Sequence, residues 1–298
     1  MAGDALYANV SLLLHANGAD ASTVFTDSSP SPKVISLIGT PTISTAQSKF
    51  GGSSILLNSS SSLTIPPGSG IGTLTADFTL EAWIFLTSSG QDSHQLLDTR
   101  TSGGTASPWV VTMEKIVGGI YVVGFFDGTP HNGVTEIPIN TWTHVAVCRS
   151  GSTIRTFTNG AVEHTYTSAA TLAGTTTAVI SLGGKDIAQY KFVGHIDELR
   201  VTQGAARYTA AFTPPTAAFP EASEITGTVL GPSGTPVART VRAYRRSDGA
   251  LMASAVSNAT TGAYLLSIPT SAEMSVVTFD NADTGTFYND RVIRVIPV

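Results

Sequence analysis

The stretch Phe78–Leu86, FTLEAWIFL, decides the fold of this chain. Successive side chains of an extended strand point to opposite faces, so Leu80 and Ile84 share one face while Trp83 and Phe85 share the other. Because both faces are partly apolar, the stretch predicts a central strand of a sheet rather than an exposed one.

Short alternating segments of this kind, bounded by Gly, Pro, Ser and Asn, recur along the chain, whereas apolar residues at helical spacing do not persist over three turns. Asn159-Gly160 is the strongest two-residue hairpin signal and separates Ile154–Thr158 from Ala161–Thr165. A single helical turn is expected at Gly204–Ala211. We therefore predict an all-β protein. Further strands are expected at Val10–His15, Ser54–Leu57, Ile120–Phe126, Thr143–Arg149, Ala178–Leu182 and His195–Val201.

The composition excludes several classes of protein. Only 12% of the 298 residues are charged and 42% are hydrophobic, which argues against a disordered tail or a coiled coil. A net charge of −5 argues against a nucleic-acid partner. Cys148 is the only cysteine and cannot form an intrachain disulfide. We find no secretion signal and no run of about 20 apolar residues, so a soluble chain without membrane insertion is expected.

A proline-rich and alanine-rich segment, residues 213–224, divides the chain. Pro214, Pro215 and Pro220 cannot donate to a strand ladder, so we expect a linker there. Residues 1–212 would then form a large β-sandwich and residues 225–298 a small one.

Four ordered motifs carry a resemblance to the concanavalin A-like, laminin G-like jelly roll: FTLEAWI at 78–84, WTHVAV at 142–147, FTNG at 157–160 and GHIDELRV at 194–201. Such domains serve as lectins, carbohydrate-binding modules, adhesion domains and some hydrolases, so the resemblance implies the fold more specifically than the function. The segment 207–215, RYTAAFTPP, is similar to the ending of such domains in tailed-phage virion proteins.

The same resemblance raises the possibility of calcium, because in parts of the family an early Asp and the Asp of the late Ile-Asp-Glu strand bind that ion. The matching positions are Asp27 and Asp197. Alternation places Asp197 on one face with Leu199 and Val201, which would turn its carboxylate inward. In the alternative, Asp27 caps a turn and Asp197 accepts backbone hydrogen bonds. No cofactor is required by the sequence.

Catalytic motifs are missing. Glycosidases need two carboxyl groups facing one sugar, but Asp197 and Glu198 are adjacent in a strand and Glu81 has no acidic partner two or four residues away. Cys148 and His144 lie four residues apart in a strand, about 13 Å from each other, which is too far for a dyad. We therefore predict a protein without enzymatic activity.

Carbohydrate binding needs only an exposed aromatic face and a few hydrogen-bonding groups on loops. The candidates are Trp109, which follows a Gly/Ser/Thr loop, and the turn that contains Phe126, Asp127, His131 and Asn132. In the alternative, Trp109 is buried under its loop and the second stretch is an ordinary hairpin turn.

The C-terminal residues resemble the transthyretin-like, carboxypeptidase regulatory-like sandwich through Gly227/Val229, Gly234/Pro236 and Gly262/Tyr264. That family is non-catalytic, which implies an assembly module. Arg242, Tyr244 and Arg246 would line one strand face and could contact a phosphate or an acidic partner. Alternatively, they form a solvated face that guards a sheet edge.

Together these features predict a bacteriophage virion protein that exposes a lectin-like domain for adhesion to host-surface glycans and docks on other virion proteins by its small domain. Many copies, or a homo-oligomer, would multiply a modest affinity. A purely structural head or tail decoration protein is the alternative, and an enzyme that degrades polysaccharide is a third possibility.

Overall fold

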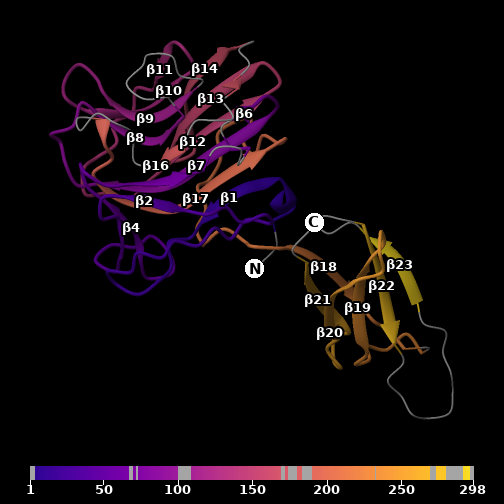
Figure 1. Ribbon diagram of the computed structural model, residues 1–298. Helices are drawn as coiled ribbons and strands as arrows, with labels where there is room; N and C mark the ends of the chain where they lie inside the picture. Colours follow the sequence, from indigo (N-terminus) through magenta and orange to yellow (C-terminus); the bar gives the residue numbers. More distant parts are fainter. Residues whose placement is uncertain are drawn as a thin grey trace. The chain divides into compact units, whose positions relative to one another are not determined.

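The computed structural model describes residues 4–66, 70–71, 73–99, 109–168, 172–173, 180–182, 190–231, 233–268, 273–279 and 291–295. The chain divides into two compact units (Figure 1). The large unit is Asn9–Phe219, and the second unit combines Met1–Ala8 with Pro220–Val298. Residues 213–219 of the expected linker thus belong to the large unit, where Phe219 is buried.

One sheet of the large unit has eight strands. Its strand order is β14-β13-β12-β7-β17-β4-β3, and β1 also pairs with β17. The strands are β1 (Val10–Leu14), β3 (Thr42–Ser44), β4 (Ser54–Leu57), β7 (Phe78–Leu86), β12 (Thr143–Ser150), β13 (Thr153–Thr158), β14 (Ala161–Thr167) and β17 (Gly194–Gln203).

The other sheet of the large unit has seven strands in the order β11-β10-β9-β8-β16-β5-β2. The strands are β2 (Ser36–Ile38), β5 (Ser62–Ile65), β8 (Ser93–Asp98), β9 (Val110–Lys115), β10 (Tyr121–Phe126), β11 (Pro130–Asn132) and β16 (Ile180–Leu182). A separate pair joins β6 (Thr73–Leu74) to β15 (Leu172–Ala173).

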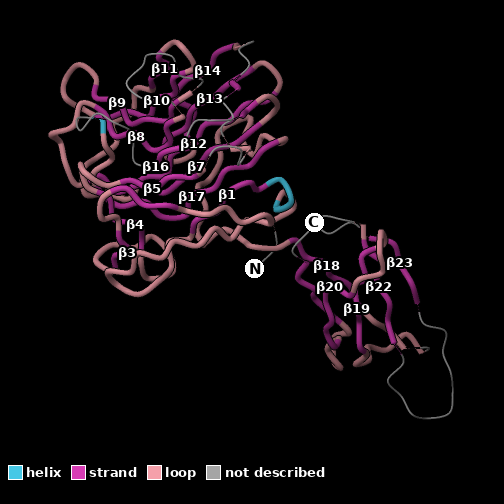
Figure 2. The backbone as a smooth tube through the Cα atoms, viewed as in Figure 1, coloured by secondary structure: helices cyan, strands magenta, loops and turns pink. Residues whose placement is uncertain are grey.

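The all-β prediction is confirmed. Figure 2 shows strands and loops almost throughout the described chain, and the 3-10 helix η1 (Tyr7–Asn9) is one short turn. The prediction of a helical turn at Gly204–Ala211 is wrong, because that segment has no regular secondary structure. Within the described residues, no helix has the length and hydropathy needed to cross a membrane.

Strand β7 is central, as its sequence predicts, and pairs with β12 and β17. All nine of its residues are buried. Leu80 and Ile84 belong to the core that both sheets enclose. We call the opposite side of this sheet, which carries Glu81, Trp83 and Phe85, its outer face. Segments of the same chain cover part of that face, because Phe50 contacts Trp83 and Phe212 contacts His144.

The hairpin predicted at Asn159-Gly160 joins β13 to β14. Both residues have positive φ, 49° and 78°, which is the combination that a type I′ turn requires. Gly160 is also the residue over which the backbone of Phe212 passes: the amide of Phe212 donates to the Gly160 carbonyl at 3.0 Å. A side chain at position 160 would collide with the Phe212 carbonyl oxygen.

The second unit has its own core around Val241, Leu266 and Val276. One of its sheets pairs two strands, and the other has the order β20-β19-β22-β23. The strands are β18 (Ser223–Thr228), β19 (Thr240–Arg245), β20 (Leu251–Val256), β21 (Ala263–Ile268), β22 (Met274–Phe279) and β23 (Arg291–Val295).

Candidate functional site

Trp109 is not available to a ligand. Its side chain is 0% exposed and belongs to the core between the two sheets, where it stacks with Phe125. The prediction of a carbohydrate-binding role for Trp109 is therefore wrong. The physical reason is that burial of a large aromatic side chain contributes more hydrophobic free energy than its exposure on a loop. The Thr99 hydroxyl also forms hydrogen bonds with the backbone of Trp109.

The second predicted stretch forms a polar and aromatic cluster at one edge of the large unit. Phe126 ends β10, while His131 and Asn132 belong to β11, and all three side chains are partly exposed. The neighbouring strand at this edge is β14 of the other sheet, which contributes His164 and Tyr166. We call Asp127, His131, His164, Tyr166 and Ser168 the edge cluster.

Asp127 holds the edge cluster together. Its Oδ1 accepts a hydrogen bond from His131 Nε2 at 3.1 Å. Its Oδ2 accepts from the Tyr166 hydroxyl at 3.2 Å and from the Ser168 hydroxyl at 3.0 Å. With three donors, this carboxylate positions the rings around it. Burial, together with the Asp127 carboxylate, raises the pKa of Tyr166, so its hydroxyl remains a donor at neutral pH.

The rings of the edge cluster are stacked. The imidazole of His131 lies parallel to the Tyr166 ring, at 3.4 Å between centroids and 10° between planes. His164 lies 5.6 Å from Tyr166. Beside them, the Asn132 side chain leans over Gly124, the position where a Cβ would collide with it. The edge thus carries stacked, partly exposed rings with imidazole and amide groups beside them, which is the chemistry that sugar recognition uses.

Asp127 and His131 of this cluster were predicted from the sequence, whereas His164, Tyr166 and Ser168 were not. His164 and Tyr166 lie more than 30 residues from Asp127 in sequence and on the other sheet. The signal that could have found them is their position at i and i+2 of a strand whose other residues are mostly polar, which places two rings on one face.

Asp27 and Asp197 do not fit a calcium site. The Asp27 carboxylate accepts four hydrogen bonds, from the backbone amides of Leu13, Ser29 and Lys33 and from the Ser29 hydroxyl. These donors would have to leave before a cation could bind. Among the described residues, no group of three or more His, Cys, Asp or Glu could hold a metal ion.

The expected orientation of Asp197 is also wrong. A β-bulge between Asp197 and Arg200, with Glu198 at φ 51°, interrupts the alternation of β17. Leu199 therefore faces the core, whereas Asp197 lies opposite Trp83 on the outer face. Its Oδ2 accepts from the amides of Lys49 and Phe50. Burial raises the pKa of Asp197 to about 6, and Glu198 adds to this shift.

Glu81 is enclosed by partners from its own chain. Arg200 donates to its Oε1 through Nε at 2.9 Å and Nη2 at 2.7 Å, and the Tyr208 hydroxyl donates to its Oε2 at 2.8 Å. Burial alone would raise the pKa of Glu81, but Arg200 and His144 lower it well below its ordinary value. The carboxylate is 0% exposed, so it cannot reach a substrate.

Cys148 is an inert thiol in this fold. It lies beside the Thr79 hydroxyl on the outer face. Burial raises its pKa to about 12, so the thiolate that nucleophilic chemistry needs is not formed at neutral pH.

In the second unit, the predicted Arg stripe is only partly formed. The guanidinium of Arg242 packs over Phe279, and Tyr244 shares its strand face, but Arg246 follows the end of β19. Because β19 lies between β20 and β22, the alternative that this stripe guards a sheet edge is wrong.

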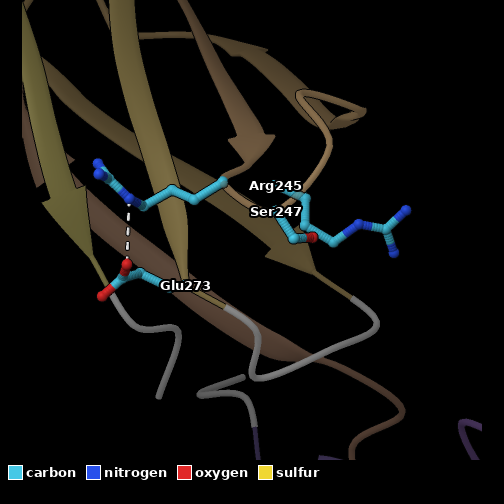
Figure 3. Close-up of a pocket in the computed structure, with 4 residues that line it drawn as sticks. Arg245, Ser247 and Glu273 are labelled. Atoms are coloured by element: carbon cyan, nitrogen blue, oxygen red, sulfur yellow. Dashed lines mark ion pairs between the residues drawn. The ribbon is translucent and has the colours of Figure 1, made fainter.

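A hollow of about 360 Å³ lies in the second unit, and Figure 3 labels Arg245, Ser247 and Glu273 among the residues that line it. Arg246 pairs with Glu273 at 3.0 Å, and Arg245 pairs with Asp248 at 2.6 Å. Both arginines that line the hollow are therefore already matched by carboxylates of the same unit, which weakens its attraction for an anion. Its lining residues are Arg245, Arg246, Ser247 and Glu273.

Comparison with known families agrees with this architecture. The profile of the concanavalin A-like lectin/glucanases superfamily matches residues 57–207. Two sheets packed face to face, in a chain that carries this profile, define the large unit as a lectin-like jelly roll. The chain belongs to the concanavalin A-like lectin/glucanases superfamily. The resemblance of the four motifs to this jelly roll is thereby confirmed.

Several solved structures are similar to this chain in fold. Domain 4 of AbnA, a GH43 extracellular arabinanase from Geobacillus stearothermophilus, in complex with arabinotriose, has a TM-score of 0.48 and 19% identity, covering 66% of this chain and 93% of that one. The binding domain of Paraclostridial Mosquitocidal Protein 1 has a TM-score of 0.48 and 14% identity, covering 96% and 76%. Botulinum neurotoxin type C, whose cell entry depends on interaction with two ganglioside molecules, has a TM-score of 0.46 and 10% identity, covering 93% and 72%. No curated protein sequence matches the chain.

Proposed function

We propose that the chain is a non-enzymatic adhesion protein whose large unit binds glycans at the edge cluster. The observation that carries this proposal is the parallel stack of His131 on Tyr166, fixed by three hydrogen bonds to Asp127. Fixed, partly exposed rings with hydrogen-bonding groups beside them suit the apolar and hydroxylated faces of a sugar. Membership of a superfamily of lectins and glucanases supports the same ligand class.

The absence of enzymatic activity is part of this proposal. The two longest strands of the eight-stranded sheet, β7 and β17, carry three acidic residues, Glu81, Asp197 and Glu198. Glu81 and Glu198 are buried with partners from the same chain. A glycosidase needs two carboxyl groups open to one sugar. The Asp197 carboxylate accepts hydrogen bonds from the backbone amides of Lys49 and Phe50.

We place this protein on the virion of a tailed bacteriophage, in many copies, with other virion proteins as partners of the second unit. The support is the segment 207–215, which is similar to the ending of jelly-roll domains in such particles. Repetition on a particle would convert weak individual glycan contacts into firm adhesion.

A purely structural decoration role is the second candidate, and one observation favours it. Strand β2 is the last strand of its sheet, and Val34, Leu37 and Ile38 in or beside it are exposed. An uncharged apolar edge strand of this kind favours contact with a neighbouring subunit.

A glycan array with the purified chain tests the adhesion proposal. Tyr166→Ala removes the stacked ring, and Thr165→Ala, on the same strand but exposed, is the matched control. We expect Tyr166→Ala to weaken glycan binding at least tenfold and Thr165→Ala to leave it unchanged. Equal binding by all three proteins would refute the edge cluster as the site. Loss of particle stability without loss of adsorption, on deletion of the protein, would favour the decoration role instead.

A further inference from the structure

A second group of aromatic side chains lies on the outer face of the eight-stranded sheet. It is at the beginning of β12, whereas Tyr166 of β14 lies near the other end of that strand. Trp142 immediately precedes β12 and contacts Phe85 of β7 at 5.5 Å between ring centroids. Phe85 contacts His195 of β17 at 5.9 Å, and the register places these two residues opposite each other. We call Trp142, Phe85 and His195 the aromatic row.

The aromatic row is the part of this face that offers an accessible tryptophan. All three tryptophans of the chain lie in described residues, and Trp83 and Trp109 are buried whereas Trp142 is partly exposed. Phe50 and the 204–219 segment contact this face at Trp83, His144 and Glu81. The aromatic row lies next to these residues on the same face, because Phe85 is two residues beyond Trp83 along β7.

The hydrogen bonds of His195 determine which of its ring nitrogens faces a ligand. The Ser54 hydroxyl donates its single proton to the Gln47 carbonyl at 2.7 Å, so Ser54 can only accept from His195 Nδ1, which lies 2.9 Å away. Burial lowers the pKa of His195, which favours the neutral ring. A neutral imidazole that carries its proton on Nδ1 has a free lone pair on Nε2.

Two polar atoms of the aromatic row are left for a ligand by the described part of the chain. Within the described residues, His195 Nε2 and Trp142 Nε1 have no hydrogen-bond partner, and neither is among the fully buried polar atoms. The row therefore combines an indole face, an N–H donor and a ring-nitrogen acceptor, and its three side chains carry no charge at neutral pH.

We propose that the aromatic row is a second saccharide-binding subsite, specific for neutral sugars. The aliphatic face of a sugar ring packs on Trp142, one hydroxyl donates to His195 Nε2, and a ring or hydroxyl oxygen accepts from Trp142 Nε1. This subsite does not depend on the edge cluster, because the two share no residue.

The test uses the complete chain and three neutral polysaccharides as probes: dextran, mannan and galactan. Acrylamide quenches the fluorescence of exposed tryptophans, so bound polysaccharide should shield Trp142 and reduce the quenching. We expect at least one probe to bind, with the affinity reduced tenfold or more by Trp142→Ala. His195→Phe, which keeps a ring beside Phe85 but removes the acceptor, should also weaken binding tenfold or more. Trp142→Phe, which keeps a ring, should lose less affinity than Trp142→Ala.

The outcomes separate this proposal from the edge cluster. Weaker binding in Trp142→Ala with unchanged binding in Tyr166→Ala supports the subsite, whatever the fate of the edge cluster. The reverse result overturns the subsite and leaves the adhesion proposal standing. If none of the three polysaccharides binds, or if His195→Phe binds as the parent chain does, the proposed subsite is wrong. Thermal unfolding of each variant confirms that the large unit is folded.

Discussion

Replacement of Arg200 by methionine should destabilise the large unit by about 3–5 kcal/mol, the range found when one partner of a buried ion pair is removed. Arg200 makes two hydrogen bonds to a carboxylate that is 0% exposed. Without the guanidinium, Glu81 keeps the Tyr208 hydroxyl, while Arg207 Nε lies 3.8 Å from its Oε1. The double variant Glu81→Gln with Arg200→Met removes both charges and should recover most of the loss.

Urea titration followed by tryptophan fluorescence measures this loss selectively, because Trp83, Trp109 and Trp142 all lie in the large unit. The pKa of Glu81 is lowered in the folded parent, so its stabilisation is present above the ordinary pKa of 4.5 and declines as the pH falls below it. In Arg200→Met the lowering by Arg200 is lost while that by His144 and Arg207 remains, so the pKa of Glu81 lies higher than in the parent and less stability is lost as the pH falls. The difference between parent and variant should therefore shrink from pH 7 to pH 4. A difference below about 1 kcal/mol at pH 7, or a double variant less stable than Arg200→Met, would refute the proposed energetics.

Three further changes test other parts of the structure. Cys148 should resist a thiol reagent in the folded chain and react on unfolding, since burial raises its pKa to about 12; rapid reaction of the native protein would contradict this. Gly160→Ala should cost more than about 1 kcal/mol, because the residue has φ 78° and a Cβ there would meet the Phe212 carbonyl. The pKa of Asp197 is raised to about 6 from 3.8, so its charge destabilises the folded state at pH 7 and this penalty disappears as the pH falls. Asp197→Asn should thus gain relative to the parent at pH 7 and lose about half of that advantage at pH 5; a constant difference would contradict the assignment.

The strands were largely predictable from the sequence because their signals are local. Alternation placed β7 at the centre of a sheet, and Asn159-Gly160 identified a hairpin whose two φ values are both positive. Strand β7 is buried on both faces, as its apolar pattern predicts, but the alternation does not reveal what covers each face. One face packs on the second sheet, and the other is covered by segments near Phe50 and Phe212.

The site residues were harder to predict because they depend on contacts between distant segments. Asp127 and Tyr166 meet across the edge of two different sheets. The orientation of Asp197 depends on a single residue, Glu198, whose left-handed conformation shifts the rest of β17 by one position. Nothing in the alternation of His195–Val201 marks that bulge. The burial of Trp109 could not be predicted either, because the sequence around a tryptophan beside a loop is the same whether the side chain is buried or exposed.

If the proposed subsite binds sugars, the outer face of the large sheet serves stability and binding together. Where residues 204–219 cross it, polar side chains such as Glu81 and Arg200 are buried, and they must be matched by partners because an unpaired buried charge is costly. In the adjacent aromatic row, Trp142 keeps a partly exposed ring, and His195 keeps a free nitrogen among the described residues. Ser54 fixes the tautomer of His195 from within the same sheet, so the acceptor is oriented before any ligand arrives. A preoriented acceptor loses little freedom on binding, which is what a weak site repeated over many copies requires.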